Sequence, residues 1–196
     1  MKYTLATLLA LIFVSCTKPP VASPSPTTPV TPNTESSMKA IVIYFSATGN
    51  TKTVAERLST TIGADIFELK PVQPYTDADL DWTNKQSRSS VEMNDRSCRP
   101  AIAEMPANLA DYDTVFVGFP IWWYREPSII DTFIESNADA LSGKTIVPFA
   151  TSGGSGMGDS SANLQQLAPA AKVFEGRRFS IDVSAENLAA WAKQYQ

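Results

Sequence analysis

Five short apolar runs along the chain indicate the strands of a largely buried sheet. The first and third runs are apolar almost throughout, which is typical of central strands of a parallel sheet with both faces covered. The second run alternates, and Ile66 and Leu69 are expected to point inward. Pro148 in the fourth run cannot donate to a strand ladder, so a bulge or a shifted register is expected there. The five runs are residues 39–45, 64–70, 114–118, 145–150 and 172–176.

Helical patterns separate these runs. After the first, Val54, Ala55, Leu58 and Ile62 recur on one helix face, and Gly63 is placed to end that helix. Further helices are expected at 84–95, from Pro127 through 134, at 161–167, and after a capping Ser184.

The alternation of strands and helices predicts a five-stranded doubly wound α/β fold. With right-handed crossovers, a chain that changes direction after its first two strands gives the strand order 2-1-3-4-5. The loops after the first, third and fourth strands then open at one edge of the sheet. Ligands of such sheets bind in the crevice at that edge.

The start of the chain predicts export. Residues 1–15 combine a short positive start with an apolar stretch too short to span a membrane, and they resemble a lipoprotein signal peptide that would make Cys16 the lipidated N-terminus. The alternative is an ordinary signal peptide with an incidental cysteine. Residues 16–37 hold six prolines and little apolar bulk, which indicates a disordered tether. We therefore expect a domain at 38–196, lipid-anchored to a bacterial membrane on its periplasmic or cell-surface side.

Composition excludes several kinds of chemistry. The 196 residues include no histidine, which removes histidine-based triads and histidine-ligated zinc. The net charge of −4 disfavours a nucleic-acid partner. The two cysteines are too few for zinc or iron–sulfur sites, and lipidation of Cys16 would leave Cys98 without a disulfide partner. Cys98 lies between two arginines, so either a lowered thiol pKa or a plain surface thiol is possible.

The loop after the first strand has the properties of an anion site. It reads Ser-Ala-Thr-Gly-Asn-Thr over residues 46–51 and leads into a helix, whose first amides are unpaired and carry partial positive charge. Ser46, Thr48 and Thr51 add hydroxyl donors, Gly49 permits close approach, and Asn50 is a candidate helix cap. The alternative is that these residues only cap the helix and face water.

Two further loops at the same edge carry unusual residues. Residues 119–127 hold three consecutive aromatic side chains, Trp122, Trp123 and Tyr124, which would face solvent unless something flat covers them or they plug the sheet edge. Residues 151–159 contain four glycines that expose backbone amides.

Together the three loops resemble those of the flavodoxin family, in a subgroup with Gly-x-Pro-Ile-Trp-Trp and Thr-Ser-Gly-Gly loops. The resemblance implies a flavodoxin-like three-layer α/β/α sandwich that binds flavin mononucleotide (FMN). The first loop would hold the phosphate, the second would line the flavin ring, and the third would bond the polar edge of the ring. The residues so implied are Ser46, Thr48, Gly49, Asn50, Thr51, Pro120, Ile121, Trp122, Trp123, Tyr124, Thr151, Ser152, Gly153 and Gly154.

Three functions remain open at this point. The first is an FMN-binding electron-transfer protein, whose redox partner the sequence does not identify. The second is an FMN-dependent reductase of quinones or nitro compounds that draws on NAD(P)H, and the third is a lipid-anchored binding module without flavin. The long connection at 72–112 has few elements of its own, and such segments are often functional. One interpretation is that it drapes over a ligand, with Trp82 and Arg88 as candidate contacts. The favoured alternative is a solvated Arg88 and a Trp82 that anchors in the core.

Overall fold

The computed structural model describes residues 38–195. The predicted signal peptide, the predicted lipidation site Cys16 and the predicted tether up to residue 37 lie outside the described residues. Among residues 38–195, no helix is long and apolar enough to cross a membrane.

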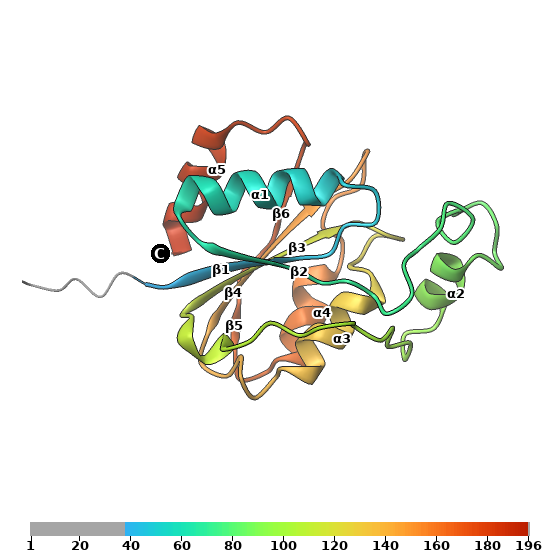
Figure 1. The fold of residues 1–196 in the computed structure, drawn as a ribbon, viewed down its shortest axis with the longest axis horizontal. Coiled ribbons are helices and arrows are strands. Elements are labelled where there is room, and N and C mark those ends of the chain that lie inside the picture. Colours follow the sequence, from blue (N-terminus) through green and yellow to red (C-terminus); the bar gives the residue numbers. More distant parts are fainter. Residues whose placement is uncertain (1–37, 196) are drawn as a thin grey trace, which may run out of the picture. The chain divides into compact units, whose positions relative to one another are not determined.

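A parallel sheet forms the middle layer, in the order β2-β1-β3-β4-β5, with β6 also paired to β4 (Figure 1). The predicted strand order is therefore confirmed. β1, β3 and β4 are buried along nearly their whole length, as their continuous apolar runs predict. The strands are β1 Ala40–Tyr44, β2 Asp65–Glu68, β3 Thr114–Pro120, β4 Thr145–Thr151, β5 Lys172–Val173 and β6 Arg177–Phe179.

Helices cover both faces of the sheet. α1 and α5 lie on one face, and α3 and α4 lie on the other (Figure 1). The core accordingly divides into two apolar clusters, one centred on Val42, Leu58 and Trp191, the other on Ile43, Ile130 and Leu164. The helices are α1 Asn50–Ile62, α2 Arg88–Asn94, α3 Ser128–Ser136, α4 Ser160–Leu167 and α5 Ala185–Ala192, with single turns at Leu109–Asp111 and Lys193–Tyr195.

The fifth position of the sheet holds two short strands where one was expected. β5 pairs with β4 through Ile146↔Val173, and β6 resumes the pairing at Phe149↔Arg177. Between them, three residues of the fifth strand face only two of β4, one of which is Pro148. The Ile146 carbonyl accepts a hydrogen bond from the Phe174 N–H, so Ile146 directs its backbone polar groups toward the fifth strand. Pro148 lies two residues further on and faces the same side, where it has no N–H to donate. The predicted bulge is confirmed at this point.

The second strand differs from its prediction on one side chain. Leu69 is buried as expected, but Ile66 is 42% exposed. Ile66 shares a face with Val42, its register partner. β2 is the edge strand, however, so Ile66 has a neighbouring strand on one side only. The expectation that Ile66 points into the core is therefore wrong.

Candidate functional site at the carboxyl edge of the sheet

The loop after β1 leaves the front of α1 without a side-chain cap. The N-cap is Gly49, which has a left-handed φ of 88° that glycine adopts at little cost. Asn50 is the first helical residue, so its predicted capping role is wrong. Ser46 Oγ instead accepts a hydrogen bond from the Gly49 N–H at 3.1 Å and closes the loop on itself. The unpaired amides of the first turn therefore face the loop with the positive end of the helix dipole.

Of the hydroxyls expected on this loop, Thr48 is the exposed one. Thr51 is only 1% exposed, and its Oγ1 lies 2.8 Å from Oγ1 of Thr151 at the end of β4. This buried hydrogen bond ties the first loop to the third and commits both hydroxyls to the scaffold.

A tight turn presents the aromatic side chains. Trp122 and Arg125 exchange two backbone hydrogen bonds, of 2.9 and 3.0 Å, around Trp123 and Tyr124. Both central residues have positive φ, 45° and 64°. Such mirror-image turns normally carry Asn or Gly, and each bulky residue held there costs roughly 1–3 kcal/mol. Trp123 is 42% exposed and Tyr124 72% exposed, so the strained backbone displays two large rings at the surface.

Trp122 behaves differently from its two neighbours. Its ring meets Phe45 and Tyr75 edge-on at centroid distances of 5.7 and 5.4 Å, and it packs on the core. Trp122 is thus half-buried and packs on the core with one part of its ring, whereas Trp123 and Tyr124 are exposed. The alternative of a hydrophobic plug formed by Trp122 and Trp123 together does not describe this arrangement.

The third loop packs against the back of this turn. Ser152 Oγ accepts hydrogen bonds from the amides of Gly154 and Ser155 and folds the glycine-rich stretch into a compact loop. Further along, Gly158 has a φ of +54°, and a Cβ at this position would lie 1.7 Å from the Tyr124 carbonyl oxygen. Only glycine allows the two loops to approach this closely.

Two adjoining hollows open where the loops meet. One has a volume of about 500 Å³ and is mainly aromatic and apolar, and the other, of about 460 Å³, has a more polar lining. They share Thr48, Pro120, Ile121 and Trp122. The aromatic hollow adds Ala47, Leu80, Trp82, Ser89, Trp123, Tyr124 and Ser155, and the polar hollow adds Asn50, Thr151, Ser152, Gly153, Arg178, Phe179, Ser180 and Ile181.

Most of the candidate residues from the sequence thus meet at one place. Ser46, Gly49, Thr51 and Gly154 line neither hollow. Ser46 and Thr51 hold the loops together from behind, as described above. The arrangement offers unpaired amides and a hydroxyl at one end and exposed aromatic rings at the other.

The sequence model of the family described as Flavodoxin matches residues 39–195. The chain belongs to the flavodoxin family. A protein from Bacteroides eggerthii described as a flavoprotein is 49% identical and has a TM-score of 0.75, and the match covers 81% of this chain and 98% of that one. A similarly described protein from Bacteroides uniformis is 42% identical, with a TM-score of 0.73 and coverage of 80% and 98%.

A more distant similarity is to a flavoprotein in complex with FMN from Lactobacillus acidophilus. It is 22% identical with a TM-score of 0.60, and the match covers 72% of this chain and 93% of that one. At this identity the similarity shows the fold. No curated protein matches the chain.

The polar hollow of this flavodoxin-family chain contains a cation that the sequence analysis missed. Arg178 on β6 lines it, and its Nη1 donates to the Ser152 carbonyl at 3.2 Å. The sequence analysis placed the beginning of the fifth strand at residues 172–176 and did not follow the strand as far as Arg178. Because the bulge opposite Pro148 lets pairing resume as β6, the carboxyl end of the fifth strand reaches the site edge. Extending the fifth strand beyond residue 176 would have brought Arg178 into the predicted site.

The long connection contributes one wall of the aromatic hollow, and Trp82 lies there and not in the core. Leu80, Trp82 and Ser89 line the aromatic hollow, and Trp82 is 75% exposed. Arg88 does not reach it. Its guanidinium donates to Glu92 and lies 4.1 Å from the centre of the Tyr75 ring. Figure 1 shows this segment, with α2, extending beyond the carboxyl edge of the sheet.

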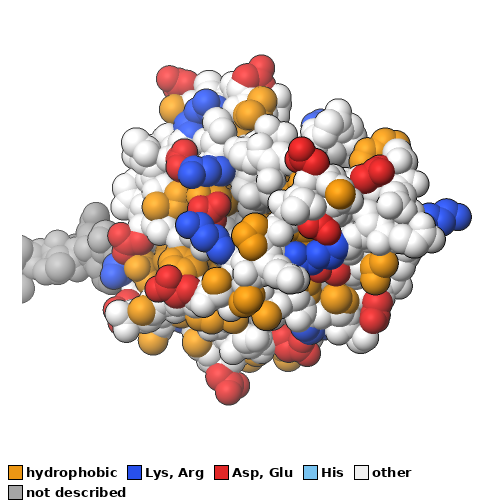
Figure 2. Space-filling model, turned by 45° about the vertical axis from the view of Figure 1, so that its right-hand side comes forward, with side chains coloured by type: hydrophobic (Ala, Val, Ile, Leu, Met, Phe, Trp, Pro, Cys, Tyr) orange, Lys and Arg blue, Asp and Glu red, His pale blue; other side chains and the backbone are white. Residues whose placement is uncertain are grey.

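The surface of the molecule carries charges of both signs. Figure 2 shows acidic and basic side chains interspersed with hydrophobic ones on the face turned toward the viewer.

Burial, with the nearby carboxylates of Glu92 and Asp95, raises the pKa of the Cys98 thiol despite two neighbouring arginines. The lowered pKa considered for Cys98 is therefore wrong, and the thiol is not activated.

Proposed function

We propose that the chain binds FMN across the two hollows and acts as an electron-transfer protein. The observation that carries this proposal is the pairing of a polar hollow at a helix front with an aromatic hollow, joined at Thr48 and Trp122. A ligand that fits both ends has an anionic head and a flat aromatic ring. The family match and the flavoprotein neighbours support FMN as that ligand.

The residues present suit the two ends of FMN. The first-turn amides of α1, the Thr48 hydroxyl and the Arg178 guanidinium would hold the phosphate. Trp123 and Tyr124 would cover the ring and limit its contact with water. The flavin, when bound, supplies the exchange of one or two electrons. The protein's part is to orient the ring and to set its surroundings.

A titration of the purified chain with FMN tests this proposal. Binding should saturate at one FMN per chain and should stabilise the fold, by about 2.7 kcal/mol when free FMN is a hundred times its Kd. An unchanged melting temperature on addition of FMN would contradict the proposal. Steady NAD(P)H oxidation with a quinone would favour the reductase alternative.

We further propose that the mature protein is exported and tethered to a bacterial membrane through a lipid on Cys16. The supporting observations are the apolar leader and the proline-rich segment after it. The replacement Cys16→Ser should abolish incorporation of labelled fatty acid and move the protein out of the membrane fraction. Unchanged labelling would contradict the anchor.

A further inference from the structure

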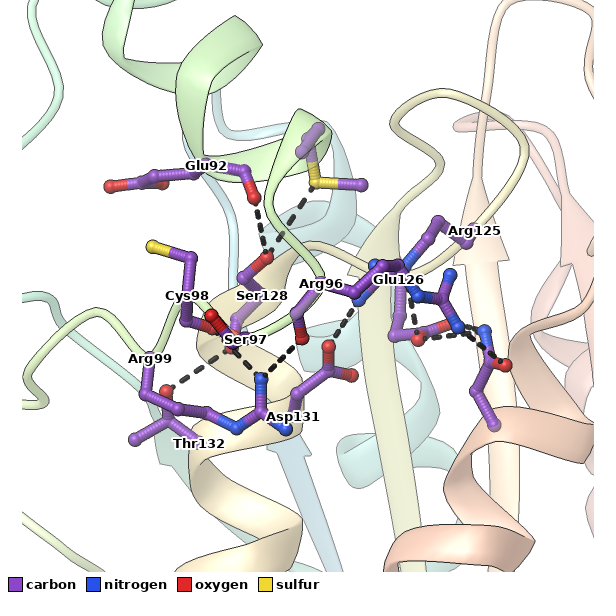
Figure 3. Close-up of polar contacts among 12 residues, drawn as sticks. Glu92, Arg96, Ser97, Cys98, Arg99, Arg125, Glu126, Ser128, Asp131 and Thr132 are labelled. Atoms are coloured by element: carbon purple, nitrogen blue, oxygen red, sulfur yellow. Dashed lines mark hydrogen bonds and ion pairs between the residues drawn. The ribbon is translucent and has the colours of Figure 1, made fainter.

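A buried ionic cluster lies directly beneath the aromatic turn. Arg125, the last residue of the turn, is 5% exposed, Glu126 is fully buried and Asp131 on α3 is 3% exposed. The Arg125 guanidinium donates to the Asp131 carboxylate through Nη2. Its Nε lies 3.3 Å from Glu126 Oε1, an ion pair without hydrogen-bond geometry. Figure 3 shows these side chains converging between the turn and α3.

The cluster is tied to the scaffold on two further sides. Asn163 on α4 donates to Glu126 Oε1 at 3.1 Å, and Arg96, after α2, donates to Asn163 Oδ1 at 3.0 Å. The side chain of Arg125 is thus held by a residue on α3 and by a carboxylate that α4 fixes. An anchor of this kind allows little movement of the residue that it holds.

Burying these charges is costly and incompletely compensated. Within residues 38–195, Arg125 Nη1 and Asp131 Oδ1 are buried and have no hydrogen-bond partner. Apolar side chains of similar volume often serve stability as well as a buried ion pair does. The cluster therefore suggests a task other than general stability.

The strained backbone of the aromatic turn, residues 122–125, indicates what this task is. Trp123 and Tyr124 sit at positive φ, a conformation that bulky residues keep only when their surroundings enforce it. One restraint is the close approach of Gly158 to the Tyr124 carbonyl. The other is Arg125, whose backbone closes the turn with Trp122 while its side chain is fixed in the cluster.

We propose that Arg125 is a positioning residue that holds the aromatic turn in its strained form and so keeps Trp123 and Tyr124 on the wall of the aromatic hollow. Asp131 and Glu126 act through it by fixing its guanidinium. The proposal about the turn stands without any ligand, and it rests on the proposed function only where ligand affinity is measured.

Amide hydrogen exchange of the chain without ligand tests the proposal. The N–H groups of Trp122 and Arg125 make the two hydrogen bonds of the turn, and that of Val117 in the buried strand β3 serves as the internal reference. Arg125→Met leaves two buried carboxylates without their cation and destabilises the whole fold. It should nevertheless speed exchange at the two turn amides at least tenfold more than at Val117. Arg125→Lys, which keeps the charge but not the forked geometry, should give a smaller increase at the same amides.

A second arginine paired to the same helix, in a more exposed ion pair, serves as the comparison. Arg99 Nε donates to Glu135 on α3 at 2.5 Å, and Arg99→Met removes this arginine–carboxylate pair away from the turn. It should leave the turn amides unchanged. Unchanged exchange in Arg125→Met, or an increase matched at Val117, would overturn the proposal. If Arg125→Met does not fold, Arg125→Lys decides by the same two criteria.

Ligand binding gives a second readout. Because the turn lines the aromatic hollow and not the polar one, Arg125→Lys should weaken FMN and riboflavin by the same factor, at least threefold. A loss confined to FMN would contradict the positioning role. If the wild-type chain binds neither flavin, the proposed function is wrong. The proposal about Arg125 is then tested by the exchange measurement alone.

Discussion

A methyl group at Gly158 should disturb the aromatic turn directly, and Gly158→Ala is the most informative single change. Gly158 has a left-handed backbone, and an added Cβ would lie 1.7 Å from the Tyr124 carbonyl oxygen. Gly143 provides the matched control, since it is also left-handed, with φ +74°, but an added Cβ there would meet only open space. Gly143→Ala therefore carries the backbone cost without the collision.

The size of the effect follows from these two costs. A left-handed backbone costs alanine about 1 kcal/mol relative to glycine. Carbon–oxygen contacts rarely fall below about 3.3 Å, so the Tyr124 carbonyl has to retreat by roughly 1.5 Å. That shift breaks at least one of the two hydrogen bonds between Trp122 and Arg125, each worth about 1 kcal/mol. We expect Gly158→Ala to lose about 2–3 kcal/mol of stability and about 4–12 °C in Tm.

Two assays separate the contributions. Denaturant unfolding should show about 1 kcal/mol lost in Gly143→Ala and more in Gly158→Ala. Gly158→Ala should bind both FMN and riboflavin roughly 2- to 10-fold more weakly, because a factor of this size corresponds to the loss of about one aromatic contact. Gly143→Ala should bind both flavins with normal affinity. Equal destabilisation by the two variants, or normal flavin affinity in Gly158→Ala, would refute the reasoning.

Three other predictions concern charge and the phosphate end. Arg178→Ala should weaken FMN about 2- to 5-fold at low salt and leave riboflavin unchanged; the control Arg177→Ala, whose guanidinium lies over Phe179, should change neither affinity. Thr48→Val with Asn50→Ala should weaken FMN far more than riboflavin in the same titration, and equal losses would place the phosphate elsewhere. Burial and a neighbouring carboxylate raise the pKa of Asp131 to about 7, so the folded state keeps a proton that the unfolded state releases above about pH 4. The stability that Asp131 contributes should therefore fall as the pH rises from about 4 to 7, and denaturation curves of Asp131→Asn should lack that decline.

The layout of the sheet could be predicted because its strands are buried on both faces. An apolar run such as residues 114–118 fits only between two helical layers, and the handedness of the crossovers then fixes the strand order. The same reasoning brings three loops to one edge before any side chain is placed. Pro148 predicts the bulge for an equally local reason, its missing donor.

Features that depend on position in the sheet were harder to predict. The alternation at 64–70 does not say that β2 lies at the edge, so Ile66 was expected in the core. Arg178 was missed because pairing resumes after the bulge only through contacts with β4. Neither fact is encoded in a window of a few residues.

The aromatic turn was the least predictable part of the site. Trp123 and Tyr124 carry no local signal for positive φ, which normally comes from Gly or Asn. Their conformation depends on Gly158 and Arg125, which act through tertiary contacts. A strained site of this kind is where local sequence rules are expected to fail.

The central claim is that one flavin spans the polar and the aromatic hollows, and an amide chemical-shift titration with FMN tests it most directly. The account predicts that the largest shifts fall together in residues 46–51, 120–125, 151–154 and 178–181, and that they saturate at one FMN per chain. Shifts confined to one of the two ends, or centred on α3 and α4, would contradict it.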